Sequence, residues 1–237
     1  MAKSWMIDEL AHAGPEHLEP AYVAGYDRKA GYDRGDGSDL ADDLAVFRAH
    51  GVAETSTIVD LGAGTGRFAL AAARQFRRVV AVDVSPAMLS HLREQAAEAG
   101  LSNLVCVRAG FLTYENAGPP VDGLYTRNAL HQLPDFWKAL ALERSARLLR
   151  PGGVLRLRDL IFDFTPSQAD GVIDRWLDRA VDDPTQGYTR DDFAEHLRTE
   201  HSTFRWLFEP MLAAAGFEIV AADFRAGVYG AYTCIKH

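Results

Sequence analysis

Cysteine is scarce in this chain, and long hydrophobic runs are absent from its sequence. Cys106 and Cys234 are the only two cysteines among 237 residues, which is too few for a disulfide framework or a cysteine-based metal site. A membrane-spanning helix needs about 20 consecutive apolar residues, and the sequence contains no such run. The first 20 residues also lack the apolar segment of a signal peptide. We therefore expect a cytoplasmic protein with reduced thiols and no membrane contact.

Positive charge is also in short supply. Lys and Arg number 25 against 33 Asp and Glu, which gives a formal net charge of −8 at pH 7. A protein that binds nucleic acid through its phosphates needs a surplus of basic side chains, so we expect a small-molecule substrate and no nucleic acid. The length suits one domain over residues 1–237, and the hydrophobic content of 48% is typical of a globular core.

The most informative stretch of the chain runs from Ile58 to Phe68. An apolar, β-branched run ends at Asp60 and Leu61, and three alternating glycines then lead into an alanine-rich segment. Glycine allows positive φ and lets the backbone approach a ligand without an intervening Cβ, and the start of a helix offers free N–H groups to it. The pattern predicts a strand, a ligand-binding turn and a helix. Its spacing differs from the G-x-G-x-x-G of a dinucleotide site.

A second acidic residue, Asp83, follows the glycine loop at the spacing of a βαβ unit. Residues 78–82 are continuously apolar, as in a buried parallel strand, and Asp83 ends this run about 20 residues after the glycine loop, where a carboxylate meets ribose hydroxyls in βαβ units. Ser85 and Pro86 then predict the N-cap and first residue of the next helix. Asp60, the glycines and Asp83 together indicate a cofactor that carries a ribose.

The rest of the chain predicts a doubly wound α/β fold. Further strands are expected at residues 104–109, 121–126, 154–159, 217–224 and 228–236, with helices between most of them. Strands that alternate with helices form parallel sheets covered on both faces. We expect a mainly parallel, seven-stranded, Rossmann-like sheet with a C-terminal antiparallel hairpin. An N-terminal helical cover (residues 1–50) and a helical insertion or cap after strand five (residues 160–202) complete the prediction.

Several motifs together resemble the class I S-adenosylmethionine-dependent methyltransferases of the small-molecule type. They are the D-x-G-x-G-x-G loop that begins at Asp60, the two Tyr-Asp pairs between residues 26 and 33, the Arg-Asn-Ala-Leu-His run at 127–131 and the Leu-Leu-Arg-Pro-Gly-Gly turn at 148–153. The resemblance implies S-adenosylmethionine as cofactor and direct displacement of its methyl group by a small-molecule acceptor. The cofactor-binding residues that it implies are Asp60, Gly62, Gly64, Gly66, Asp83, Val84, Met88, Gly110, Phe111 and Asn128.

The chain departs from the family at one place. These methyltransferases usually have Gly-Asp after the third strand, with the Asp reaching the adenine amino group, whereas this chain reads Ala109-Gly110-Phe111. The family's carboxylate is therefore missing. A backbone N–H near Phe111 and its ring are the remaining candidates for an adenine contact, although Phe111 as plain core is equally consistent with the sequence.

Residues for the acceptor and for catalysis are less well marked. His131, at the end of the fourth strand, and His201 are candidate catalytic residues, with Asp159 as a further candidate base. For His131, a structural role bonded to the backbone is an equally good interpretation. Tyr26 and Tyr32 in the N-terminal cover, with Arg205 and Trp206 at the start of a late helix, are the predicted substrate-pocket residues. Trp206 is interpreted equally well as packing under the insertion.

Two functions of other classes stay open. One is a nicotinamide oxidoreductase, which would need a different glycine spacing and a catalytic Tyr/Lys or His pair. The other is a module that binds S-adenosylmethionine or S-adenosylhomocysteine without transferring a methyl group. We expect no metal, because His196 and His201 are five residues apart and do not share a helical face. A homodimer is possible.

Overall fold

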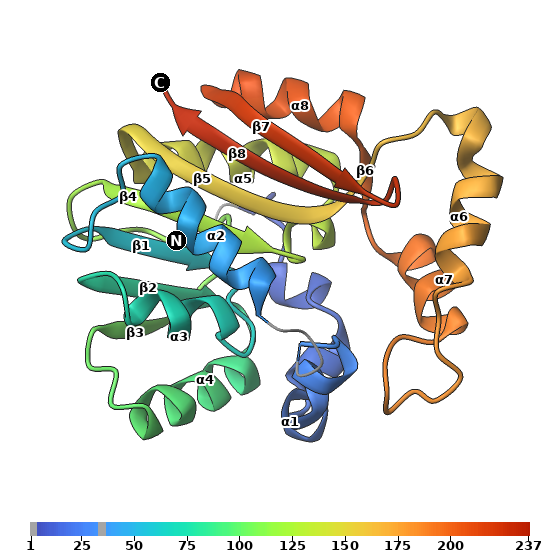
Figure 1. Ribbon diagram of the computed structural model, residues 1–237, viewed down its shortest axis with the longest axis horizontal. Helices are drawn as coiled ribbons and strands as arrows, with labels where there is room; N and C mark the ends of the chain where they lie inside the picture. Colours follow the sequence, from blue (N-terminus) through green and yellow to red (C-terminus); the bar gives the residue numbers. More distant parts are fainter. Residues whose placement is uncertain (1–3, 33–36) are drawn as a thin grey trace.

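The computed structural model describes residues 4–32 and 37–237 (Figure 1), so residues 1–3 and 33–36 of the predicted cover lie outside the described residues. Within that part of the chain, no helix combines the length and the apolar composition needed to cross a bilayer. The N-terminal cover consists of two short 3-10 helices and two α-helices: η1 (Glu9–His12), η2 (Pro15–Leu18), α1 (Pro20–Lys29) and α2 (Ser38–Ala49).

A central sheet follows the cover. Its order is β3-β2-β1-β4-β5-β8-β7, with a short strand β6 also paired to β5. The strands are β1 (Thr57–Leu61), β2 (Arg78–Asp83), β3 (Leu104–Arg108), β4 (Val121–Arg127), β5 (Leu149–Phe162), β6 (Thr203–Phe204), β7 (Phe217–Arg225) and β8 (Tyr229–Lys236). The strands β1 to β5 pair in parallel, and β8 runs antiparallel to both β5 and β7. The predicted doubly wound sheet and its C-terminal hairpin are confirmed, and β6 is an addition to them.

Two layers of helices bury the sheet because successive side chains of a strand point to opposite faces. On one face, Ile58 and Val79 pack with α2 and α3 (Arg67–Ala73). On the other face, Val59 and Val80 pack with α5 (Asp135–Leu148) and α8 (Arg205–Ala214). The helix α4 (Pro86–Glu98) begins as predicted, since the Ser85 hydroxyl accepts a hydrogen bond from Met88 N and Pro86 opens the helix.

The insertion lies at one end of the sheet, at the right of Figure 1. It contains η4 (Pro166–Gln168), α6 (Ala169–Leu177) and α7 (Arg190–Thr199). Within the predicted range of 160–202, β5 continues to Phe162 and pairs there with β6, so the helical part begins with η4. A small apolar cluster around Trp176, Phe164 and Val228 holds the insertion on the sheet.

Candidate functional site

A large cavity lies at the carboxyl ends of β1, β2 and β4, where open α/β sheets bind their ligands. It encloses about 1050 Å³ of empty space, a volume that includes its open mouth. Its floor and walls come from the segments that follow the strands, and its roof comes from the N-terminal cover. The lining residues include Glu9, His17, Tyr26, Tyr32, Asp60, Gly62, Gly64, Arg67, Asp83, Val84, Met88, Gly110, Phe111, Arg127, Asn128 and Gln132.

The glycine loop after β1 provides the nearest backbone. Gly64 has φ +54°, and a Cβ built on it would meet nothing within 4 Å, so its missing side chain leaves room on the cavity side. Gly62 also lines the cavity, whereas a Cβ on Gly66 would lie 2.0 Å from Leu92. Gly66 therefore serves the close packing of α3 on α4 and does not line the cavity.

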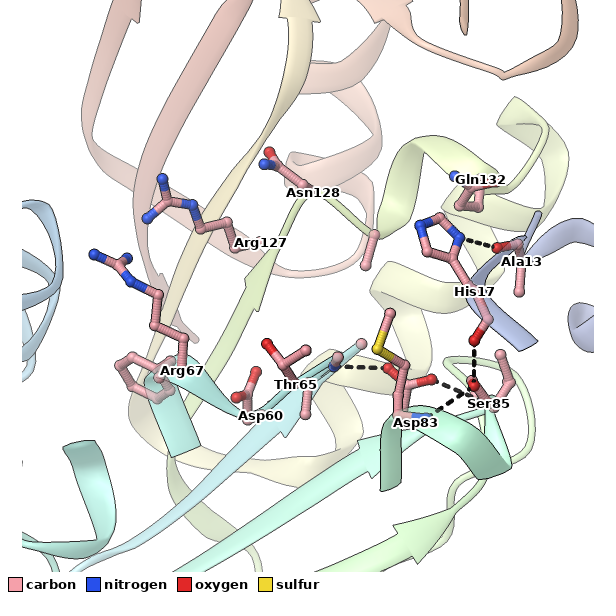
Figure 2. A pocket seen from close by; sticks show the side chains of 18 of the residues that line it. Ala13, His17, Asp60, Thr65, Arg67, Asp83, Ser85, Arg127, Asn128 and Gln132 are labelled. Carbon is pink, nitrogen blue, oxygen red and sulfur yellow. Dashed lines mark hydrogen bonds between the residues drawn. The ribbon is translucent and has the colours of Figure 1, made fainter. Parts of the chain in front are cut away.

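Asp83 is held rigidly at the end of β2. Its Oδ2 accepts a hydrogen bond from Gly64 N at 2.8 Å and its Oδ1 accepts one from Ser85 N at 2.8 Å (Figure 2). Burial raises the pKa of this carboxyl despite those donors. The Ser85 hydroxyl donates to the carbonyl of His17 at 2.7 Å, which ties the roof to the cofactor-binding side of the sheet.

Asp60 is buried at the end of β1, on the floor of the cavity. Its Oδ2 is buried and has no hydrogen-bond partner among the described residues. Burial, with the neighbouring Asp83 adding to it, raises the pKa of Asp60 to about 8. A buried acceptor without a partner is costly, so this oxygen suits a donor or a cation on a ligand.

Asn128 follows β4 directly and has the positive φ of +49°, which is uncommon outside glycine. Its N–H donates to the carbonyl of Arg158 at 2.9 Å, and the residue lines the cavity. Asparagine tolerates this left-handed conformation better than most residues. Strained backbone of this kind is concentrated at ligand sites, and here it turns the chain at the cavity edge.

Glu9 enters the cavity from the N-terminal cover, beside Gly110 and Phe111. Its Oε1 accepts from Leu112 N at 3.0 Å, and its Oε2 accepts from the Thr113 hydroxyl at 3.1 Å. Burial raises the pKa of this carboxyl. The segment after β3, which lacks the family's acidic residue, therefore contacts the carboxylate of Glu9, about 100 positions earlier in the chain.

Tyr26 and Tyr32 line the roof, as predicted for a lid. Their ring centroids are 6.4 Å apart, and the guanidinium carbons of Arg67 and Arg127 lie 4.7 and 5.1 Å from the Tyr32 ring centroid. Both arginines pair with Asp39 and hold its pKa well below the usual range against the effect of burial. This part of the wall was not identified from the sequence.

His131 lies near the cavity but does not line it. It is buried in the short 3-10 helix η3 (Leu130–Gln132), where its Nδ1 contacts Asp159 and its Nε2 lies 2.8 Å from Glu200 Oε2. Burial alone would lower the pKa of His131, but the two carboxylates outweigh it and raise the pKa to about 10. The ring is then protonated at neutral pH, so the structure argues against His131 and Asp159 as a general base. The contacts are with carboxylates, which corrects the expected backbone role.

The other three predicted residues lie elsewhere. His201 donates its backbone N–H to the carbonyl of His131 at 2.9 Å and is not a cavity residue. Arg205 pairs with Glu209 and Asp163, and Trp206 is 57% exposed and stacks on Phe204. The prediction that these residues line the acceptor pocket is wrong for this cavity, because none of the three is among its lining residues.

We expected no cluster of metal ligands from the sequence, but the fold brings three possible ligands together. The ligand atoms of His131, His196 and Glu200 all lie within 4.8 Å of one another. His196 lies in the last turn of α7 and Glu200 is the C-cap four residues later, a spacing that brings their side chains together. The sequence carried that signal, but nothing in it indicated that His131 would meet them.

Comparisons with known proteins agree with this geometry. Residues 58–153 match the model of a family described as a methyltransferase domain. An uncharacterized methyltransferase of Geobacillus kaustophilus is 26% identical over 172 residues, which is 73% of this chain and 74% of that protein. Residues 58–153 thus carry a methyltransferase domain, and the resemblance seen in the sequence motifs is confirmed.

Solved structures share the fold at low sequence identity. An S-adenosylmethionine-dependent methyltransferase of Aquifex aeolicus superposes with a TM-score of 0.61 at 16% identity, over 92% of this chain and 99% of that one. Magnesium protoporphyrin IX methyltransferase of Synechocystis, solved with S-adenosylmethionine bound, gives 0.59 at 15% identity over 99% and 100%. The cyclase SpnF gives 0.63 at 17% identity over 83% and 80%. The fold expected from the sequence is confirmed, while the cyclase indicates that the fold alone does not fix the reaction.

Proposed function

We propose that this protein transfers the methyl group of S-adenosylmethionine to a small-molecule acceptor bound in the cavity. One observation carries the proposal. Asp60 and Asp83 face a glycine turn whose residue 64 leaves open space, at the carboxyl ends of adjacent parallel strands. A ligand that carries ribose hydroxyls and a cationic amino group satisfies both carboxylates, and Asp60 Oδ2 otherwise has no partner in the described structure.

The residues divide between the two halves of the cofactor. Asp83, Val84, Met88 and Phe111 would hold the nucleoside, with Glu9 supplying the carboxylate that the segment after β3 lacks. Asp60, Gly62, Gly64 and Asn128 would hold the amino-acid half. The bound cofactor supplies a methyl group on a sulfonium, which is already a good electrophile.

The chain's own part is then alignment and exclusion of water. Tyr26 and Tyr32 line the roof of the cavity, and half-buried aromatic rings there suit a flat or apolar small molecule. No general base is assigned, because His131 is held between two carboxylates and His201 lies outside the cavity. An acceptor whose nucleophilic atom is already unprotonated needs none.

The test is titration calorimetry with S-adenosylhomocysteine and, separately, with NADH. We expect saturable binding of S-adenosylhomocysteine with one site per chain, and none of NADH. Binding of NADH alone would contradict the proposal and favour the oxidoreductase. Methyl transfer is tested by incubating the protein with trideuteromethyl-labelled S-adenosylmethionine and a cell's small-molecule extract, followed by mass spectrometry. Tight binding with no labelled product would favour a binding module or a non-methylating relative such as the cyclase.

A further inference from the structure

A compact cluster of ionisable side chains joins the insertion to the core, away from the cavity. His131 comes from η3 after β4, and His196 and Glu200 come from the last turn and C-cap of α7. Glu200 Oε2 lies 2.8 Å from His131 Nε2 and 2.7 Å from His196 Nδ1. The two imidazole rings are tilted by 60° with centroids 5.0 Å apart, so two ring nitrogens and one carboxylate oxygen converge on a single point.

Each ring is oriented by a contact on its far nitrogen. His131 Nδ1 contacts Asp159 Oδ1, and His196 Nε2 lies 2.7 Å from the Ser202 hydroxyl. Asp159 is itself fixed, because it accepts hydrogen bonds from Leu130 N and Leu160 N at 2.8 and 2.7 Å. Histidines that bind metals are held in this way, with the second nitrogen on a carboxylate or another polar group that fixes the tautomer.

The converging oxygen is not satisfied by the protein alone. Glu200 Oε2 is buried, and among the described residues neither ring nitrogen meets it with hydrogen-bond geometry, although both lie within 2.8 Å. A buried carboxylate oxygen between two imidazole nitrogens, without a good hydrogen bond, is a position that a cation can fill.

We propose that His131, His196 and Glu200 bind a divalent transition-metal ion, and that zinc is the ion that fits best. Two imidazole nitrogens and one carboxylate oxygen are a set that zinc accepts, with a fourth position left for water. Ligand bonds of about 2.0–2.2 Å in tetrahedral geometry separate donor atoms by roughly 3.3–3.5 Å. The observed separations are shorter, so the ion enters as Glu200 moves outward by about half an ångström. Glu200 ends α7, and its side chain is 24% exposed.

The ion's place assigns it a structural role. None of the three ligands lines the cavity, but His131 immediately precedes Gln132, which does. A metal bound here fastens α7 of the insertion to η3 of the core. It thereby fixes the position of the insertion on the core without taking part in the chemistry. Both imidazoles bind the ion as neutral rings, so binding releases any proton that a ring carries between its nitrogen and Glu200.

The experiment measures zinc in the tag-free, full-length protein after dialysis against a zinc-containing buffer. Inductively coupled plasma mass spectrometry should find about one zinc per chain, and EDTA should lower the Tm because the ion binds only the folded protein. His196→Ala and Glu200→Gln should each weaken zinc binding by about 100-fold or more, since loss of even an outer-shell partner costs 10–100-fold. His91→Ala, on the distant helix α4, is the matched control and should bind zinc normally.

Three results would overturn the proposal: no zinc after dialysis, a Tm that EDTA does not change, or equal zinc binding by the cluster variants and the control. If a variant fails to fold, the wild-type protein loaded with Co²⁺ decides the matter. An intense visible absorption indicates a four-coordinate site, and a spectrum like that of aqueous Co²⁺ contradicts it. Binding of S-adenosylhomocysteine, measured with and without EDTA, reports on the cavity separately from the metal.

Discussion

The carboxylate of Glu9 occupies the space that a side chain at Gly110 would need. A Cβ built on Gly110 would lie 2.3 Å from Glu9 Oε1 and 2.6 Å from Oε2. The two residues are more than 100 positions apart, yet a side chain at position 110 would require the Glu9 carboxylate to move. The buried carboxylate from η1 therefore fills the space that the missing side chain after β3 leaves open.

Gly110→Ala should release Glu9 from the cavity wall. The new methyl group displaces the carboxylate, so Leu112 N and the Thr113 hydroxyl lose their acceptor, at a cost of about 1–3 kcal/mol in the free energy of unfolding. Urea denaturation measures the loss. Gly118→Ala is the control, because a Cβ there meets only Asn116 at 3.7 Å. Equal stabilities of the two variants would contradict the coupling.

Asp83→Ala should weaken binding of S-adenosylhomocysteine by about 1.5–3 kcal/mol, the range for a hydrogen bond to a charged group. Titration calorimetry measures it. Asp122→Ala is a matched control, since Asp122 also accepts from a backbone N–H, that of Thr57 at 2.9 Å, but does not line the cavity. Unchanged affinity in Asp83→Ala, or the same loss in both variants, would remove Asp83 from the cofactor site.

Asp60 should make the protein less stable as the pH rises. Its pKa is about 8 in the folded chain against a model value of 3.8, so between these values the folded state holds a proton that the unfolded state has lost. The free energy of unfolding then falls with rising pH, by at most about 1.4 kcal/mol per pH unit from this group. The free energy of unfolding of Asp60→Asn, relative to that of the wild type, should therefore be higher at pH 8.5 than at pH 5.

Asp122→Asn should show the opposite trend. Arg150 and Thr57 N lower the pKa of Asp122 despite the effect of burial, so its contribution to stability is present above its ordinary pKa and disappears in acid. The wild type should exceed this variant at pH 5 and above, and the difference should shrink toward pH 3. Parallel curves for the wild type and Asp60→Asn would contradict the assignment for Asp60.

Lys29→Met should loosen the contact between the N-terminal cover and the insertion. Lys29 Nζ pairs with Asp192 at 3.1 Å and lies 5.6 and 5.4 Å from the ring centroids of Tyr22 and Tyr188. Without this cation, amide hydrogen exchange in α1 and α7 should accelerate, while β1 and β4 stay protected. Arg198→Met, which removes an exposed pair with Glu195, should leave exchange in α1 unchanged.

Trp206→Ala should leave S-adenosylhomocysteine binding and any methyl transfer nearly unchanged, because Trp206 is outside the cavity. Tyr26→Ala, in the roof, should lower methyl transfer more than cofactor affinity. Rates with labelled S-adenosylmethionine and calorimetry on both variants measure the contrast. If Trp206→Ala abolished transfer and Tyr26→Ala did not, the acceptor would have to bind near α8.

Local patterns predicted the sheet and most of the residues on the floor of the cavity. The glycine loop, Asp60 and Asp83 belong to strand ends whose positions follow from apolar runs, and their neighbours in space are set by the parallel order β2-β1-β4. Ser85 and Pro86 marked the start of α4 correctly because capping is a local event. Tyr26 and Tyr32 were found through the family resemblance and not through spacing.

Contacts between distant segments escaped sequence reasoning for a physical reason. Glu9 and His131 reach their partners only after the cover and the insertion have folded onto the sheet. The local hydrophobic periodicity that predicts helices and strands carries no signal for such long-range contacts. Trp206 was misplaced on similar grounds. Its position off the core stripe of α8 indicated an unusual environment, but the helix faces solvent there and Phe204 supports the ring.

The roof of the cavity and its floor have separate origins along the chain. The floor lies within residues 58–153, the part that matches the methyltransferase family, whereas the roof comes from segments before residue 50, braced through Lys29 by the insertion after β5. The strand ends that carry Asp60 and Asp83 are thus covered by segments that lie outside the matched region. Under the proposed function, changes in these flanking segments should alter the choice of acceptor while the floor keeps the cofactor.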